Sequence, residues 1–292
     1  MSNSMSNKDA GTGAKALLTL SRILCYIFLI LLTVLCLFSF YILIINSTRA
    51  NSEIQKGFTL LPGKSFLTNF NTLIANDNIP ILRALGNSLF ISTLTAMLTT
   101  YFSAMTAFGL HIYNFKFKKF AFSFILLIMM VPTQVSTLGF IQLITKMGLM
   151  NTFYPLIIPS IAAPIVFFFM FQYLASVLPQ EIVEAARVDG SNEFNTFNSI
   201  VLPIMKPALA VQAIFSFVTS WNNYFVPALV IDSKNNKTIP ILIAQLRSAD
   251  YMKFDLGQVY IMICVAIIPL LIVYLFLAKF IIRGVTLGSV KG

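Results

Sequence analysis

The sequence contains little of what enzyme active sites and metal centres are built from. Its 292 residues include a single histidine, His111, so neither a zinc site with histidine spacing nor a Ser/His/Asp arrangement with a spare imidazole can be drawn. The three cysteines, Cys25, Cys36 and Cys264, lie inside apolar stretches without an evident redox or metal partner, and we interpret them as small hydrophobic residues. We therefore expect neither a histidine-based metal centre nor a Ser/His/Asp active site in this chain.

Acidic residues are also scarce, and they are unevenly placed. There are 10 Asp and Glu residues, and none of them lies in a long apolar stretch. Ion-coupled carriers usually place an ionisable group near the middle of the bilayer to bind or relay a cation. The sequence offers no carboxylate for such a relay, so an ion-coupled secondary carrier acting alone is the less favoured alternative.

Charged residues of both signs make up 10% of the sequence, whereas 58% of the residues are hydrophobic. Soluble domains carry about 25% charged residues, so this composition indicates a membrane protein. The formal charge of +10 does not point to nucleic acid, because the basic residues are scattered between apolar stretches and form no basic face.

Six apolar stretches reach the length of about 20 residues that a helix needs to cross the hydrocarbon core. They are 22–45, 84–110, 119–143, 157–178, 206–231 and 256–281. The predicted fold is all-α, a polytopic membrane protein with six transmembrane helices. Its expected parts are a leader (1–21), a first transmembrane helix (22–45) that is retained, an external loop (46–83), a five-helix core (84–283) and a tail (284–292).

Lysine and arginine residues near the helix ends set the expected orientation. One basic cluster precedes the first stretch, one fills the link between the second and third stretches, and one closes the chain: Lys8, Lys15, Arg22; Lys116, Lys118, Lys119; Lys279, Arg283, Lys291. Six crossings place all three clusters on the same side. We expect both termini and the loop 179–205 to be cytoplasmic.

Four of the ten carboxylates lie between two apolar stretches, in EIVEAARVDGSNE (181–193). Pro179 suits the start of a helix, Gly190 its end, and Ser191 the N-cap of a second short helix. One face of the first helix is expected to carry Ile182, Ala185, Ala186 and Asp189, at i, i+3, i+4 and i+7. An acidic segment is generally a solvated loop, but this spacing favours a small apolar contact surface with an acidic rim.

The same segment resembles the EAA signature of the membrane subunits of bacterial ABC importers. The agreement consists of Glu184-Ala185-Ala186, then Asp189-Gly190, then Ile200-Val201-Leu202-Pro203. Asn87-Ser88-Leu89, Trp221-Asn222 and the ending 284–292 are also similar to the six-helix subunits of the maltose and oligosaccharide type, and the similarity runs from about residue 15 to the end.

The resemblance implies a coupling mechanism. In that family the EAA loop docks in a cleft of a cytoplasmic ATPase, which implies that Glu184 pairs with a basic group, that Ala185 and Ala186 make close contact, and that Gly190 permits the turn. The expected ATPase-coupling residues are Glu184, Ala185, Ala186, Asp189, Gly190, Leu202 and Pro203. The implied partners are a second homologous permease, two ATPase copies and an extracytoplasmic solute-binding protein. The resemblance further implies that this chain is not an enzyme and performs no bond-making chemistry itself. No cofactor is expected in it, because ATP and Mg²⁺ bind to the partner ATPase, which carries out the hydrolysis.

Polar residues of the second and fifth stretches are the candidates for the solute pathway. In the second stretch hydroxyls recur on one helix face, where helix packing is favoured over pathway lining: Ser88, Ser92, Thr95, Thr99, Ser103 and Thr106. The fifth contains SWNNYFVP, whose amides and aromatic rings suit an uncharged polyhydroxylated solute and equally suit an interfacial belt. The candidate pathway residues are Asn87, Ser88, Gln134, Trp221, Asn222, Asn223 and Tyr224.

The expected function is that of a permease subunit of a carbohydrate importer, for an oligosaccharide in particular, in the bacterial cell membrane. The resemblance also implies that the tail contacts the ATPase through Gly288, Ser289, Val290 and Lys291, and that the external segment Asp232–Asp255 meets the binding protein. A permease for glycerol phosphate or polyamine is the alternative. A phosphorylated solute would need a positive cavity and a polyamine buried acids, and the middle of the apolar stretches supplies neither.

Overall fold

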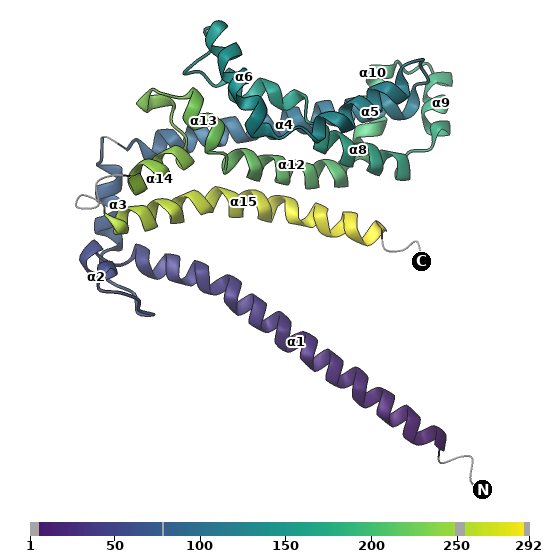
Figure 1. The fold of residues 1–292 in the computed structure, drawn as a ribbon. Coiled ribbons are helices and arrows are strands. Elements are labelled where there is room, and N and C mark those ends of the chain that lie inside the picture. Colours follow the sequence, from purple (N-terminus) through teal and green to yellow (C-terminus); the bar gives the residue numbers. More distant parts are fainter. Residues whose placement is uncertain (1–5, 78, 249–254, 289–292) are drawn as a thin grey trace. The chain divides into compact units, whose positions relative to one another are not determined.

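The computed structural model describes residues 6–77, 79–248 and 255–288, with side chains for 19–77, 79–246 and 255–278 (Figure 1). Every regular element in these residues is a helix, which confirms the all-α prediction. The α-helices are α1 (Ser6–Ser47), α2 (Asn51–Gln55), α3 (Phe66–Ile74), α4 (Ile81–Ile112), α5 (Lys118–Met129), α6 (Thr133–Lys146), α7 (Tyr154–Ile157), α8 (Pro164–Val177), α9 (Gln180–Val188), α10 (Glu193–Thr196), α11 (Leu202–Ile204), α12 (Lys206–Trp221), α13 (Phe225–Val230), α14 (Ile239–Ser248) and α15 (Leu256–Gly288). Two 3-10 turns, η1 (Ile158–Ile161) and η3 (Lys234–Asn236), and one π turn, η2 (Phe197–Val201), complete the described elements.

Four helical stretches are long and apolar enough to cross a membrane: Thr19–Ser47, Ile81–Ile112, Tyr154–Val177 and Leu256–Ala278. Two bent pairs raise the number to six if each pair is one span: Lys118–Met129 with Thr133–Lys146, and Glu193–Ile204 with Lys206–Trp221. These spans confirm a polytopic membrane protein. The side of the membrane on which each terminus lies stays a prediction.

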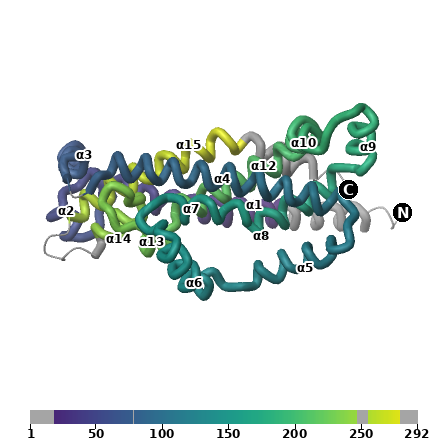
Figure 2. Tube along the Cα trace, turned by 90° about the horizontal axis from the view of Figure 1, so that it is seen from above, coloured from purple at the N-terminus to yellow at the C-terminus, as the bar shows by residue number. Residues whose placement is uncertain are grey.

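The third predicted transmembrane helix, 119–143, is bent into two helices. α5 and α6 meet at 98°. Pro132 stands at the break, directly before α6, and a proline there has no backbone N–H with which to continue the ladder of α5. Figure 2 shows the two helices as one arm that curves away from α4.

The fifth predicted transmembrane helix, 206–231, is not continuous either. α12 ends at Trp221 and α13 begins at Phe225. Asn222 and Asn223 occupy the gap, and asparagine favours helix ends and turns because its side chain competes for backbone hydrogen bonds. The expectation of one helix over 206–231 is therefore wrong.

The described residues form two compact units. The smaller takes the chain up to Phe70 together with Asp255–Cys264, and the larger takes the rest. In the smaller unit the loop after α1 is held by Arg49, whose guanidinium donates to Asn46 Oδ1 (3.1 Å) and to the carbonyl oxygens of Glu53 and Gly57. Arg49 is buried, so these oxygens satisfy a cation that has lost its water.

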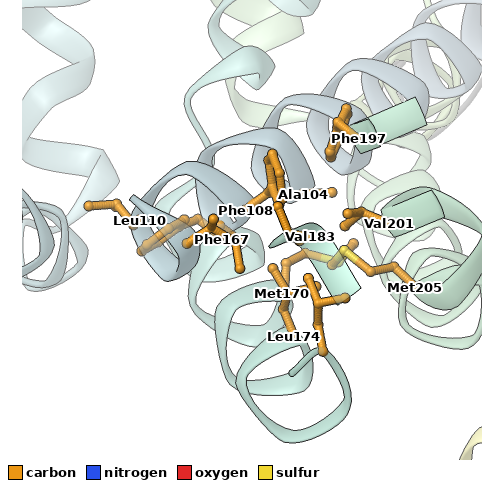
Figure 3. Close-up of a cluster of buried hydrophobic side chains, with 13 residues drawn as sticks. Ala104, Phe108, Leu110, Phe167, Met170, Leu174, Val183, Phe197, Val201 and Met205 are labelled. Carbon is orange, nitrogen blue, oxygen red and sulfur yellow. The ribbon is translucent and has the colours of Figure 1, made fainter. Parts of the chain in front are cut away.

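In the larger unit α4 is the central helix and packs against both α8 and α12 (Figure 1). The main apolar cluster joins Ala104 and Phe108 of α4 with Met170 and Leu174 of α8 and with Phe197 of η2 (Figure 3). Seen along the unit, α9 and α10 lie near one end of α4, and α13 and α14 lie toward the other (Figure 2). The acidic segment is therefore built onto the same core as the membrane helices.

Candidate docking hairpin and solute groove

The segment 179–205, the acidic hairpin, begins with a helix whose two ends are well defined. Pro179 is extended and directly precedes α9. At the other end Gly190 has φ +84° and donates its N–H to the carbonyl of Arg187 (3.0 Å), while the N–H of Ser191 reaches the carbonyl of Ala186 (2.9 Å). These two bonds form a Schellman motif, which requires a left-handed residue such as glycine. The predicted helix end at Gly190 is confirmed.

The second short helix, α10, is capped by Asn192 and not by Ser191 as predicted. Asn192 Oδ1 accepts a hydrogen bond from the backbone N–H of Asn195 (2.8 Å). Ser191 closes the Schellman motif with its own N–H, so the next residue is the extended one that can serve as the N-cap. The hydroxyl of Ser191 instead accepts from the side chains of Asn195 (3.0 Å) and Thr196 (2.9 Å).

One face of α9 packs inward. Val183 is fully buried and Ala186 is 5% exposed, at the i, i+3 spacing of a single helix face. The prediction that Ala185 and Ala186 both make an outer contact is therefore wrong for Ala186, and only Ala185 is exposed. Farther along, Leu202 packs against the main apolar cluster and Pro203 is exposed.

The outer face of the hairpin combines unpaired acids with apolar side chains. Glu181, Glu184 and Asp189 are exposed, and none of them has an ion-pair partner within the described part of the chain. Val188 is 88% exposed and Phe194 is 68% exposed. Large apolar side chains left in solvent beside unpaired charges are typical of a surface that contacts another protein.

Glu193, the fourth carboxylate of the segment, is used inside the protein. Its Oε1 accepts from Arg187 Nε at 2.7 Å, the one ion pair among the residues with described side chains, and its Oε2 accepts from the hydroxyl of Tyr113. The guanidinium carbon of Arg187 also lies 5.6 Å from the centroid of the Tyr113 ring, within cation–π distance. Tyr113 directly follows α4, so this cluster connects α9 and α10 to the end of α4.

A groove with a volume of about 720 Å³ is lined by α4, α8 and α12, within the range of about 300–1,000 Å³ typical of ligand sites. Its polar residues on α12 and the turn after it are Gln212, Ser216, Thr219, Ser220 and Asn223. Their spacing of i, i+4, i+7, i+8 and i+11 places them on one helix face. Phe169 and Phe215 add aromatic rings, and no charged residue of the described chain lines the groove.

Two of these polar side chains, those of Gln212 and Ser216, are buried. The hydroxyl of Ser216 has no hydrogen-bond partner within the described residues, and Gln212 is 8% exposed. An unpartnered buried hydroxyl costs about 1–3 kcal/mol, so the hydroxyl of Ser216 contributes no hydrogen bond to the stability of the described fold. Thr99 on α4 differs, because its hydroxyl donates to the carbonyl of Ser160 in η1 (3.0 Å).

Comparison with known proteins decides the family. Residues 96–287 match the family model of the binding-protein-dependent transport system inner membrane component. The chain belongs to this family. It is 37% identical over 255 residues to an arabinooligosaccharides transport system permease protein (AraQ) of Halalkalibacterium halodurans, covering 86% of this chain and 89% of the relative.

Two further comparisons agree. The trehalose/maltose transport system permease protein MalG of Thermococcus litoralis is 30% identical over 276 residues, covering 94% of this chain and 98% of the relative. A solved chain of a bacterial ABC transporter involved in the import of the acidic polysaccharide alginate superposes with a TM-score of 0.75 at 19% identity, covering 88% of this chain and 96% of that chain. The fold predicted for this chain, that of an ABC importer permease, is confirmed.

In this permease Asn87 and Ser88 hold a loop in place. The amide of Asn87 donates to the carbonyl oxygens of Asn235 (2.8 Å) and Lys237 (3.0 Å), and the hydroxyl of Ser88 accepts from the N–H of Ile239 (2.9 Å). Both polar groups are taken up by the backbone before and at the start of α14. These hydrogen bonds give both side chains a structural use, and their predicted place on the solute pathway stays a prediction.

The remaining candidate pathway residues of the permease divide into two groups. Trp221 is 2% exposed and stacks on Phe217 with 5.7 Å between ring centroids, which is packing, and Gln134 is exposed on α6 and does not line the groove. Asn223 does line the groove, whereas the neighbouring Asn222 is exposed. The structure thus places Asn223 in the groove and Trp221 and Gln134 outside its lining, and the pathway role of all three stays a prediction.

Tyr224 lies in a second, smaller pocket of about 270 Å³ that also contains Asp232 and Lys237.

The tail contact predicted for the permease falls mostly outside the described residues. Gly288 ends α15, and Ser289, Val290 and Lys291 are not among the residues described.

The Arg187–Glu193–Tyr113 cluster shifts the titration of its members. Burial, and after it the hydrogen bond to Glu193, raises the pKa of Tyr113 above its ordinary 10.0. The hydrogen bond from Arg187, and after it that from Tyr113, lowers the pKa of Glu193 below its ordinary 4.5. The stabilisation from the Glu193 carboxylate is fully present above pH 4.5 and is lost as the pH falls through the lowered pKa of Glu193. The stabilisation from the Tyr113 hydroxyl is fully present below pH 10.0 and is lost as the pH rises through the raised pKa of Tyr113. The cluster is therefore intact at neutral pH.

Tyrosine ionisation is followed by phenolate absorbance in the native chain and in Tyr113→Phe, and the difference between the two titrations isolates Tyr113. This difference should show a pKa above 10.0. In Glu193→Gln the midpoint should move back toward 10.0 without reaching it, because burial is the larger cause and persists. Glu181→Gln removes an exposed carboxylate of the same hairpin and should leave the midpoint in place. A native midpoint at the ordinary value would contradict the observed contact.

Proposed function

We propose that the chain is the permease subunit of an ATP-driven importer of carbohydrate. The relatives named for arabinooligosaccharides and for trehalose/maltose support a sugar as the solute. In this proposal the chain works with a second homologous permease, two copies of a cytoplasmic ATPase that hold ATP and Mg²⁺, and an extracytoplasmic solute-binding protein. Both termini and the acidic hairpin face the cytoplasm.

The uncharged lining of the groove is the observation that carries the choice of solute. A sugar needs hydrogen-bond partners for its hydroxyls and flat apolar surfaces for its C–H groups. Gln212, Ser216 and Asn223 offer the first, and Phe169 and Phe215 offer the second. An oligosaccharide that lies along α12 would meet both kinds of group.

Charged solutes fit this groove less well. A phosphorylated solute such as glycerol phosphate calls for lysine or arginine, and a polyamine calls for buried acids. The described residues that line the groove include neither. Neutral carbohydrate is therefore preferred over both alternatives.

The acidic hairpin is the proposed contact with the ATPase. Glu184 is exposed and unpaired within the described chain, so it is free to meet a basic group of a partner. Val188 and Phe194 supply apolar area beside it. The complementary surface would be a cleft with an apolar floor and a basic edge, since buried apolar area gives affinity and charge complementarity gives register.

Replacing Glu184 by arginine tests this contact. Opposed like charges at a docked interface cost several kcal/mol, so the amount of ATPase that copurifies with the assembled membrane chains should fall by about tenfold or more. Asp77→Arg makes the same change of charge at an exposed site outside the hairpin and should leave copurification unchanged.

Two outcomes would contradict the proposal. Equal copurification of the ATPase with native and Glu184→Arg chains would remove Glu184 from the docking contact. Sugar accumulation driven by a proton or sodium gradient in vesicles that contain this chain alone would replace an ATP-driven importer by a secondary carrier.

A further inference from the structure

One helix of the larger unit connects three places that matter for transport. α4 is continuous over 32 residues, a length of about 48 Å at 1.5 Å per residue. Thr95 and Thr99 in its middle line the groove. Asn87 and Ser88 near its start hold the backbone of 235–239. Its last turns and the residue after it hold the acidic hairpin.

The hairpin is fastened to α4 at its entry and exit. At the entry, His111 Nε2 donates to the carbonyl of Leu178 (3.1 Å). At the exit, the hydroxyl of Tyr101 donates to Asn198 Oδ1 (3.2 Å), and the Tyr101 ring lies 5.6 Å from that of Phe197. These contacts lie on the inner side of the hairpin and fix where the segment leaves and rejoins the core.

The tip of the hairpin is fastened separately, by the charged cluster. Arg187 belongs to α9, Glu193 belongs to α10, and Tyr113 follows α4, so the three side chains join both arms of the tip to the end of the helix. The same tip carries the exposed side chains of Val188 and Phe194. The cluster therefore joins the part of the hairpin that carries this outer face directly to the end of α4.

We infer that Arg187, Glu193 and Tyr113 are positioning residues for transport, which fasten the hairpin tip to α4 so that a movement of the docked tip is passed along α4 to the groove. The inference rests on the proposed function, because it takes the hairpin as the surface on which the ATPase acts. Tight packing favours such transmission, since close-packed helices shift as rigid pieces and do not deform continuously.

The test compares Tyr113→Phe with the native chain in the full assembly of permeases, ATPase and binding protein. A reporter, Thr219→Cys, is placed in the groove after Cys25, Cys36 and Cys264 have been replaced by alanine. Three quantities are measured: the ATPase that copurifies, the basal ATP turnover, and the change in maleimide labelling of the reporter when Mg-ATP and orthovanadate are added. The labelling change reports transmission, and it requires no knowledge of the solute.

In Tyr113→Phe the copurified ATPase and the basal turnover should stay at native levels, while the nucleotide-driven change in labelling should shrink by about 3- to 10-fold. This size corresponds to the loss of one hydrogen bond to the Glu193 carboxylate. Because the carboxylate is partly exposed, solvent reduces the free energy that this bond contributes. Tyr173→Phe removes a tyrosine hydroxyl that has no hydrogen-bond partner within the described residues and should have no effect. The exchanged pair Arg187→Glu with Glu193→Arg should recover part of the change that each single reversal removes.

Each result decides between the inference and the proposed function. A native labelling change in Tyr113→Phe would overturn the inference and leave the proposed function intact. Loss of ATPase copurification in proportion to the labelling change would also overturn it, because the cluster would then serve only the shape of the docking surface. If the native chain copurifies no ATPase and its reporter ignores nucleotide, both the proposed function and the inference fall.

Discussion

Uptake of a labelled arabinooligosaccharide of three units should fall by about 10- to 100-fold when Gln212 is replaced by leucine, because an unmatched polar group in a buried site costs about 1–3 kcal/mol and a factor of ten corresponds to 1.4 kcal/mol. Gln212 lines the groove between α4, α8 and α12 and is 8% exposed. The bound solute would lose the amide as a partner for its hydroxyls. ATPase copurification should not change, because the acidic hairpin is untouched.

Gln172→Leu is the matched control. Gln172 is a glutamine of α8 that is exposed and does not line the groove, so its replacement by leucine makes the same chemical change outside the groove. Ser216→Ala is a second variant, and it removes a buried hydroxyl with no partner within the described residues. Stability should stay the same or rise while uptake falls. Native uptake in both Gln212→Leu and Ser216→Ala would mean that the groove is a packing surface and not a solute site.

Much of the fold could be predicted from the sequence, because a long apolar stretch that crosses a bilayer has few structures other than a helix. The helix end at Gly190 could also be predicted, since the left-handed position at a helix end strongly favours glycine. The interruptions inside the stretches were harder to predict. Prolines occur both at breaks and within intact helices, as Pro132 and Pro269 illustrate, and only tertiary packing decides which of them bends the chain.

The candidate site was predictable only where its signal is local. The polar face of α12, from Gln212 to Asn223, has helical spacing in the sequence and could have been found by the same count that revealed the hydroxyls of α4. The partnership of Glu193 with Tyr113 has no such signal, because 80 residues separate the two. Asn87 and Ser88 were predicted as pathway residues because the sequence gives no sign of their hydrogen-bond partners either. Their partners, about 150 residues away, are backbone groups that no sequence pattern marks.

Replacing Phe197 by alanine should lower the free energy of unfolding by about 3–5 kcal/mol, the usual cost of removing a buried phenylalanine. Phe197 is 2% exposed and belongs to the buried cluster that also contains Phe108 of α4 (Figure 3). The centroid of its ring lies 5.6 Å from those of Tyr101 and Phe108. The cavity left by the substitution removes the van der Waals contacts of the Phe197 ring, and this cost does not depend on whether water or lipid surrounds the protein. The lower stability should therefore appear as a lower melting temperature in detergent.

Phe194→Ala is the control, three residues earlier in the same hairpin. Phe194 is 68% exposed, so its truncation should change stability by less than about 0.5 kcal/mol. If the outer face of the hairpin docks on the ATPase, this variant should instead lose copurified ATPase. Phe197 and Phe194 thus separate the two tasks of the hairpin, since one side chain anchors it to α4 and the other is left for a partner. Equal destabilisation by both substitutions would contradict that division.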